Sequence, residues 1–172
     1  MSILHRVLVQ QPQSQLRTML SWLEKAEAHA RDRDFSCETF LDARLVADMF
    51  PLRRQIQSAT DSAKFIGARC AGVTPPKHAD DETTLAELRT RTEEVIAFLD
   101  TIGPDALEGV ADRVAKLSFL PEGKGARALD YAIEMGLPNF QFHLTTTYAI
   151  LRANGVPLGK RDYIGGMTLV DL

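Results

Sequence analysis

Hydrophobic residues recur at spacings of three and four positions in four separate segments of the chain. This period places apolar side chains on one face of an α-helix and polar side chains on the other. The sequence therefore predicts four amphipathic helices, each with one stripe for a shared core. The four stripes comprise Leu16, Met19, Leu20, Leu23 and Ala26; Leu52, Ile56, Ala59, Ala63, Ile66 and Cys70; Leu85, Leu88, Thr92, Val95, Leu99 and Ile102; and Leu137, Phe140, Leu144, Thr147 and Leu151.

The second and third predicted helices carry recognisable start and stop residues. Pro51 suits the first turn of the second helix, and Gly72 suits its C-terminal end. Thr84 and Glu87 have the spacing of a capping box, in which each side chain accepts a hydrogen bond from a free backbone N–H. The third helix should therefore begin at Thr84 and stop at Gly103-Pro104.

The first and last helices have less distinct ends. The first helix should run from about Pro12 to Arg31, with Pro12 in its first turn. Ala126 to Met135 is predicted to be helical, and Pro138 either restarts that rod or kinks it, since its ring blocks one internal hydrogen bond. After Asn154, glycines and prolines rule out another stable helix. The tail should pack back along the bundle.

Three segments connect the predicted helices. Ser36 can start a short helical turn that ends near Leu41, and the residues from Asp42 to Phe50 form an open connection. The segment from Val73 to Thr83 contains two prolines and three consecutive acidic residues, so it is a linker between helices. The segment from Gly109 to Lys124 fits neither the helical nor the strand period, and we predict that it is irregular.

Four amphipathic helices without a clear strand pair predict an all-α helical bundle, which buries four stripes at once. At 172 residues, the chain is expected to form one domain over residues 1–172. The linker of about 11 residues can span roughly 36 Å when extended. A helix of about 21 residues is roughly 31 Å long. The linker can therefore cross the length of the bundle, but its length alone leaves the order of the helices open.

Composition narrows the possible partners. Hydrophobic residues make up 45% and charged residues 25%, as in ordinary globular proteins. The formal net charge of -3 argues against nucleic acid as a partner. No apolar run or secretory signal is evident, so we expect a cytoplasmic protein without a membrane partner. Cys37 and Cys70 lack the spacing of a zinc or redox motif, and Cys70 should be a reduced core residue.

The most distinctive stretch begins at Leu137 and reads LPNFQFHLTTTYAILRANGVPLGKRDYIG. It resembles the last helix and tail of a bacterial family of domains of unknown function in the DinB-like (DinB/YfiT) superfamily of four-helix bundles. The resemblance implies up-down-down-up helix order. In the metal-binding members of that superfamily, three histidines form the site, one on the second helix and an i, i+4 pair on the fourth. His143 and Thr147 would stand for that pair, and Ser58 or a neighbour for the other histidine, so two of three ligands are replaced.

A polar cleft is the remaining candidate site. Of the four histidines, only His143 is predicted to lie on a helix beside a core stripe. A histidine near a carboxylate can act as an acid or base near neutral pH. Alternatively, the imidazole only forms hydrogen bonds inside the bundle, with Gln55 or Asp48 as expected partners, and Tyr148 packs between helices. The candidate cleft comprises His143, Asn139, Gln55, Ser62, Asp48, Arg44 and Tyr148.

Three functions are compatible with this sequence. The first is a bundle that binds a small molecule or a partner and has lost the three-histidine metal site, with no cofactor. The second is a hydrolase or transferase of the superfamily that uses divalent zinc or nickel, with His143 and carboxylates such as Asp48 as ligands. The third is a structural homodimer in which helix faces pair across a two-fold axis. Self-association is expected in any case, because related bundles present a flat helix face.

Overall fold

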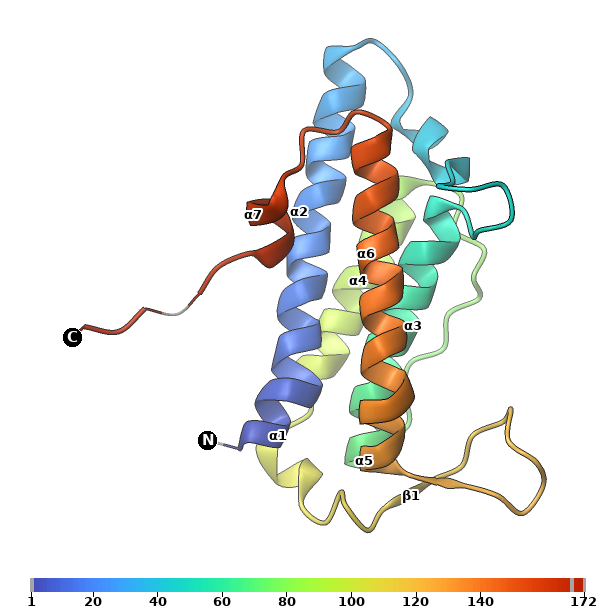
Figure 1. The fold of residues 1–172 in the computed structure, drawn as a ribbon, viewed down its shortest axis with the longest axis vertical. Coiled ribbons are helices and arrows are strands. Elements are labelled where there is room, and N and C mark those ends of the chain that lie inside the picture. Colours follow the sequence, from blue (N-terminus) through green and yellow to red (C-terminus); the bar gives the residue numbers. More distant parts are fainter. Residues whose placement is uncertain (1, 168, 172) are drawn as a thin grey trace.

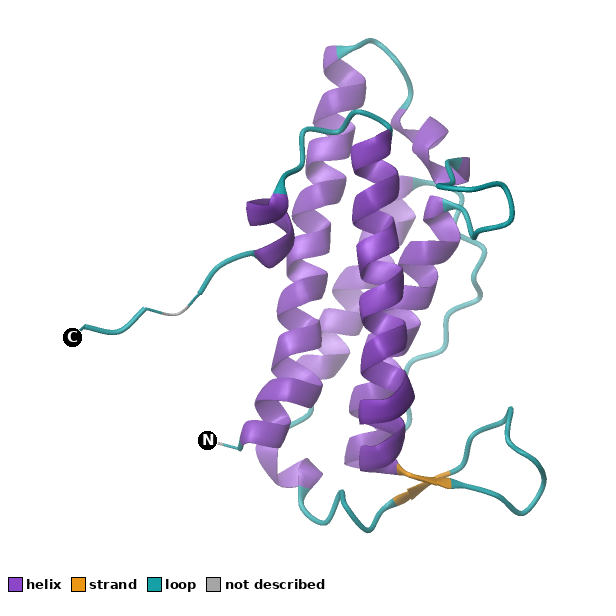
Figure 2. Ribbon diagram, viewed as in Figure 1, coloured by secondary structure: helices purple, strands orange, loops and turns teal. Residues whose placement is uncertain are grey.

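Four long helical rods form the protein (Figures 1 and 2). The computed structural model describes residues 2–167 and 169–171. The long rods and the turns that continue them are α1 (Ile3–His5), η1 (Arg6–Gln10) and α2 (Gln11–Asp32); α3 (Leu52–Ala71); α4 (Leu85–Asp100); and α5 (Ala128–Tyr131), η4 (Ala132–Gly136) and α6 (Leu137–Ala153). The short elements are the 3-10 helices η2 (Cys37–Asp42) and η3 (Pro104–Leu107), the strands β1 (Val114–Ala115) and β2 (Ala126–Arg127), and α7 (Lys160–Ile164).

The helices follow an up-down-down-up order. In Figure 1, α2 ascends, and α3 descends on the other side of the bundle, where it packs mainly against α6 and α4. The linker after α3 returns along the outside of the bundle, so that α4 also descends and α6 ascends last. The linker therefore makes the lengthwise crossover that its length allowed. This all-α bundle confirms the predicted fold class.

Two prolines lie inside continuous rods, each two positions after the last residue of a π-helical turn. The π turn η1 precedes Pro12, and the π turn η4 precedes Pro138. In each turn the last bond reaches back five residues, from the Gln11 N–H to the Arg6 carbonyl and from the Leu137 N–H to the Ala132 carbonyl. The wider turn accommodates a ring that would clash in a regular α-helix.

The prediction that the first helix begins at Pro12 is therefore wrong. The rod begins at Ile3, where the Ser2 side chain accepts a hydrogen bond from the His5 N–H. Pro138 likewise continues the last rod without restarting it. Both outcomes follow from the π turns, which hydrophobic spacing does not reveal.

The predicted boundaries of α3 and α4 are confirmed. Gly72 caps α3 at a φ of 72°, a left-handed conformation that glycine adopts without strain. Thr84 and Glu87 form both bonds of a capping box at the start of α4. The core is also as predicted, because these stripe residues are fully buried: Leu52, Ile56, Ala59, Ala63, Ile66, Leu85, Leu88, Val95 and Leu99.

Two segments differ from the sequence prediction. Ala126–Arg127 is not helical but pairs with Val114–Ala115 as a short antiparallel ladder, so the segment before the last rod contains a small hairpin. The tail contains the short helix α7, although its glycines and prolines argued against one. The Gly159 N–H donates to the Asp162 carboxylate at 2.7 Å and caps this helix. The Tyr163 ring stacks on Trp22 at 5.6 Å, so tertiary contacts stabilise a helix too short to form alone.

The crossover is held by a cluster of charges, which we call the Arg91 network. The Arg91 side chain is only 2% exposed. Its guanidinium bonds Asp61 of α3 at 2.7 Å, and Asp80 and Glu82 of the linker at 2.6 and 2.9 Å. Lys64 also contacts Asp61, at 2.7 Å. This network joins α3, α4 and the crossover.

Two further sequence expectations concern Cys70 and membranes. Cys70 is buried, and burial raises the pKa of its thiol to about 11, although the charge of Arg113 opposes this shift. The thiol is therefore protonated at neutral pH and lies in the core as predicted. Among the described residues, no helix has the length and apolar character needed to cross a membrane.

Candidate functional site

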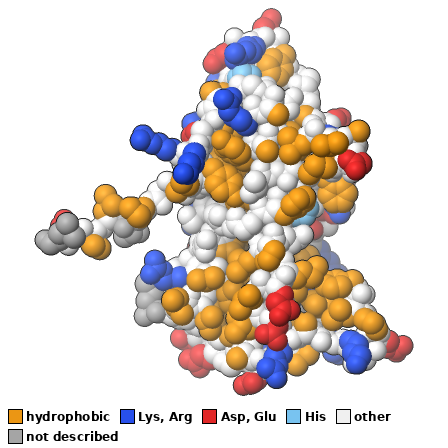
Figure 3. Space-filling view, viewed as in Figure 1, with side chains coloured by type: hydrophobic (Ala, Val, Ile, Leu, Met, Phe, Trp, Pro, Cys, Tyr) orange, Lys and Arg blue, Asp and Glu red, His pale blue; other side chains and the backbone are white. Residues whose placement is uncertain are grey.

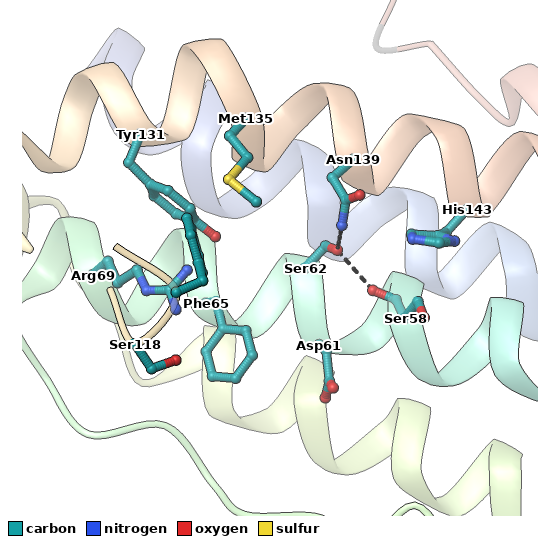
Figure 4. A pocket seen from close by; sticks show the side chains of 11 residues that line it. Ser58, Asp61, Ser62, Phe65, Arg69, Ser118, Tyr131, Met135, Asn139 and His143 are labelled. Carbon is teal, nitrogen blue, oxygen red and sulfur yellow. Dashed lines mark hydrogen bonds between the residues drawn. The ribbon is translucent and has the colours of Figure 1, made fainter. Parts of the chain in front are cut away.

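A groove of about 310 Å³ opens between α3 and the rod formed by α5, η4 and α6 (Figure 4). Ser118, from the loop between the two strands, lies at one end, and its neighbour Phe119 also lines the groove. His143 lies at the other end (Figure 4). The groove is lined by Ser58, Asp61, Ser62, Phe65, Arg69, Ser118, Phe119, Tyr131, Met135, Asn139 and His143.

One wall of the groove is a row of side chains spaced four residues apart, Tyr131, Met135, Asn139 and His143. In a regular α-helix each four-residue step turns the side chain by about 40°, so three steps would turn it by about 120°. The π turn η4 accommodates one extra residue and removes about 100° of that drift. The row therefore stays on one face of the rod, as Figure 4 shows.

Gln55 fixes the tautomer of His143. The Gln55 side-chain N–H donates to the Phe50 carbonyl at 3.1 Å, which leaves its amide oxygen facing His143. That oxygen lies 2.7 Å from Nδ1 of His143 and can only accept a hydrogen bond. Nδ1 therefore carries the proton. Nε2 is then an unprotonated acceptor on a side chain that lines the groove.

His143 is also held neutral. Burial lowers the pKa of its imidazole, and the positive charge of Arg54 lowers it further. Aromatic rings surround it, with Phe142 at 5.2 Å in an edge-on arrangement and Phe50 stacked at 6.5 Å. Both phenyl rings are half exposed. Figure 3 shows hydrophobic side chains gathered on the surface around α6, so a ligand that reaches this end of the groove meets an apolar rim.

The middle of the groove carries an ordered chain of hydrogen bonds. The Asn139 amide donates to the Ser62 hydroxyl at 2.8 Å, and that hydroxyl donates to the Ser58 carbonyl at 2.7 Å. Since the Asn139 nitrogen is bound to Ser62, its amide oxygen is oriented away as an acceptor. Asn139 and His143 thus place two oriented acceptors one helical turn apart.

The structure brings together only some of the residues predicted for the cleft. His143, Asn139 and Ser62 line the groove, and Gln55 supports His143 from behind. Arg44 and Asp48 are exposed and do not line the groove, and Arg44 instead donates to the Met49 carbonyl of its own loop.

Tyr148 also lies outside this groove and packs against the rings of Trp22 and Tyr163, each at about 5.5 Å. Sequence reasoning missed Tyr131, Met135, Phe65, Arg69 and the hairpin loop residues. The four-residue spacing that ends at His143 was a usable signal for the first two, but only with knowledge of the π turn.

His143 is not the only buried helical histidine, contrary to the prediction. His5 and His29 also lie on helices and are mostly buried. Nε2 of His5 contacts the Ile102 carbonyl at 2.7 Å, and Nδ1 of His29 contacts Arg33 at 2.9 Å. His78 lies on the crossover between Lys64 and Glu94. Among these four, His143 is the one that lines the α3–α6 groove.

The resemblance assigns the superfamily's ligand positions to His143, Thr147 and Ser58 or a neighbour, and the side chains of these three residues do not fit a transition metal. Thr147 donates its hydroxyl proton to the His143 carbonyl at 2.9 Å and lies fully buried. Ser58 offers only a neutral hydroxyl. Zinc and nickel sites need three or four converging imidazole, thiolate or carboxylate donors. Within residues 2–167 and 169–171, no cluster of three or more histidine, cysteine, aspartate or glutamate side chains could hold a metal ion.

Comparisons with known proteins give a family but no activity. Residues 4–164 match the model of a domain of unknown function, DUF1993. The chain is similar to the crystal structure of a DinB family member protein from Shewanella denitrificans, with 39% sequence identity and a TM-score of 0.94. That alignment covers 99% of this chain and 96% of the other. No curated protein matches.

Proposed function

The chain belongs to the DUF1993 family of DinB-like bundles, and from this premise we propose that its α3–α6 groove binds a small molecule without the superfamily's three-histidine metal site. The observation that carries the proposal is the fixed tautomer of His143. Gln55 is 1% exposed and uses both ends of its amide to hold this one imidazole. A histidine that only filled space would not need its second nitrogen presented to a groove.

The groove also has the composition of a ligand site. Such sites combine apolar walls with a few oriented polar groups. Phe65, Tyr131 and Met135 supply the walls, and Asn139 and His143 supply the acceptors. The π turn η4 supports the same conclusion, because π turns occur often at functional sites and this one aligns the row. A ligand that donates hydrogen bonds from a hydroxyl or amide group suits the His143 end.

We expect small neutral aromatic amides and alcohols to bind in this groove. The probes are benzamide and benzyl alcohol, followed by two-dimensional amide NMR of the labelled protein. Chemical shifts should change at Ser58, Ser62, Asn139 and His143 in a saturable manner. Ser58→Leu should abolish these changes because the larger side chain fills the groove.

Ser21→Leu introduces the same side chain at an exposed position of α2 and should leave the titration unchanged. If neither probe shifts groove residues in the wild-type protein, or if Ser58→Leu leaves their binding intact, the groove is not the binding site.

We expect His143→Ala to lower the free energy of unfolding by roughly 1–3 kcal/mol, because the buried Gln55 oxygen loses the donor that His143 supplies. Denaturant titration measures this loss. His143→Gln can restore a donor and should lose less. Metal content, measured by elemental analysis after incubation with zinc or nickel, should be zero in both the wild type and His143→Ala. One equivalent of metal in the wild type that is lost in His143→Ala would instead support the metal-dependent hydrolase or transferase.

A further inference from the structure

Arg69 lies at the opposite end of the groove from His143 and is clamped between two aromatic rings (Figure 4). Its guanidinium carbon is 4.7 Å from the centre of the Phe65 ring and 4.4 Å from that of Tyr131. Stacking on ring faces fixes the plane of a guanidinium and leaves its N–H edge available. Arginine binds carboxylate and phosphate groups through that edge, often with two parallel hydrogen bonds.

The charge of Arg69 is not matched by a neighbouring acid. No carboxylate of the described residues lies within 4.0 Å of it. Asp61 is the acidic side chain among those that line the groove, and it already contacts both Arg91 and Lys64 at 2.7 Å. Two cations therefore compensate Asp61, while Arg69 remains available for a charge from outside the protein.

Tyr131 makes this clamp rigid. The residue is only 6% exposed, and burial raises the pKa of its phenol more than the neighbouring Arg69 lowers it, so the ring is neutral at physiological pH. A neutral ring stacks on a cation without forming an ion pair with it. Ser118 lies at the same end of the groove and offers a hydroxyl beside the clamp (Figure 4). A guanidinium and a hydroxyl are the usual donors around a bound oxyanion.

We infer that the ligand of this groove carries a carboxylate or phosphate group, which binds at Arg69. This inference rests on the proposed function and adds the chemical class of the ligand. Ser58 and Arg69 are eleven residues apart on α3, a separation of about 16 Å along the helix axis. The ligand is therefore an elongated organic anion, with its acidic group at Arg69 and a hydrogen-bond donor near His143. An inorganic ion would occupy only one end.

The test compares benzoate and phenyl phosphate with neutral benzamide, which has nearly the shape of benzoate. Dissociation constants come from amide NMR titrations of the full chain at constant ionic strength. At least one anion should bind about tenfold more tightly than benzamide, the effect of a hydrogen bond to a charged group. It should shift residues around Arg69 and Tyr131. The tighter of the two anions identifies whether the group is a carboxylate or a phosphate.

Arg69→Gln keeps a side chain with hydrogen-bond donors but removes the charge, so it should weaken anion binding by about tenfold and leave benzamide binding unchanged. Arg152→Gln makes the same change at an exposed position of α6 and should have no effect. A folded spectrum of Arg69→Gln verifies that the groove survives.

Two failures are distinguishable. If benzamide binds the groove but neither anion binds more tightly, or if Arg69→Gln weakens the anions and benzamide equally, this inference is wrong and the proposed function stands. If no probe shifts groove residues, both the proposed function and this inference are wrong.

Discussion

Replacing Arg91 with methionine should lower the free energy of unfolding by roughly 3 kcal/mol at pH 7. Removal of one partner from a buried ion pair typically costs about 3–5 kcal/mol, because the remaining charge stays buried without compensation. Asp61 and Asp80 retain side-chain exposures of 27% and 31%, which favours the lower end of this range. Denaturant titration of both proteins at pH 7 measures the loss.

Arg89→Met is the matched control on the same helix. Arg89 pairs with Glu24 and Glu27, but these contacts are closer to the surface, with side-chain exposures of 60% and 32% for the two acids. Exposed pairs contribute about 0–1 kcal/mol. An equal loss in both variants would show that the Arg91 network contributes no more than an ordinary surface pair.

The Arg91 network should also make the free energy of unfolding depend on pH in the acid range. Burial alone would raise the pKa of Asp80 and of Glu82, but hydrogen bonds outweigh it and hold both pKa values below their ordinary 3.8 and 4.5. For Asp80 the donors are Arg54 and Arg91, and for Glu82 they are Arg91 and Gln57. A depressed folded-state pKa contributes stability above the unfolded pKa, which is lost as the pH falls through the folded value. The difference between wild type and Arg91→Met should therefore shrink below about pH 4.5.

Local patterns predicted the rods and their caps, because those depend on neighbours three or four residues away. The stripe of α3 and the capping box of Thr84 are examples. The Arg91 network escaped prediction, although Arg91 follows Leu88 by three residues and precedes Val95 by four, beside the stripe. Its partners Asp80 and Glu82 were interpreted only as residues that interrupt a helix. Which acid meets which arginine depends on the path of the crossover, and no local spacing encodes that path.

The groove residues likewise divide into those that local spacing predicts and those that it does not. Asn139, Ser62, Gln55 and His143 could be found because each borders a core stripe. Arg69 and Phe65 also border a stripe. Exposed arginines are common on helices, however, so the sequence did not distinguish Arg69 as a candidate ligand-binding residue. Its clamp requires Tyr131, which faces Arg69 only because the π turn η4 rotates the start of the rod. Asp48 and Arg44 do not line this groove, and the sequence could not place them because an open connection has no periodicity to orient its side chains.

Trp22 should be the most sensitive single position, with Trp22→Ala lowering the free energy of unfolding by roughly 3–5 kcal/mol. The side chain is fully buried, so truncation leaves a large cavity. Its indole N–H also donates to the Asp162 carbonyl at 2.8 Å, and its ring stacks on Tyr163. Because α7 depends on these contacts, the variant should release the tail as well as lose stability. Limited trypsin digestion should cleave after Lys160 or Arg161 faster than in wild type under native conditions.

Trp22→Phe separates the two effects. Phenylalanine keeps a ring for Tyr163 to stack on but cannot donate to the Asp162 carbonyl, so the loss should be smaller than in Trp22→Ala. Tyr163→Ala removes the stacking partner from the tail and leaves the core ring in place, so it should release α7 at little cost to global stability. If α7 stays protected from trypsin in both Trp22→Ala and Tyr163→Ala, the aromatic contacts do not hold it. The ion pair between Lys25 and Asp162 and the Gly159 cap would then be sufficient to keep this short helix folded.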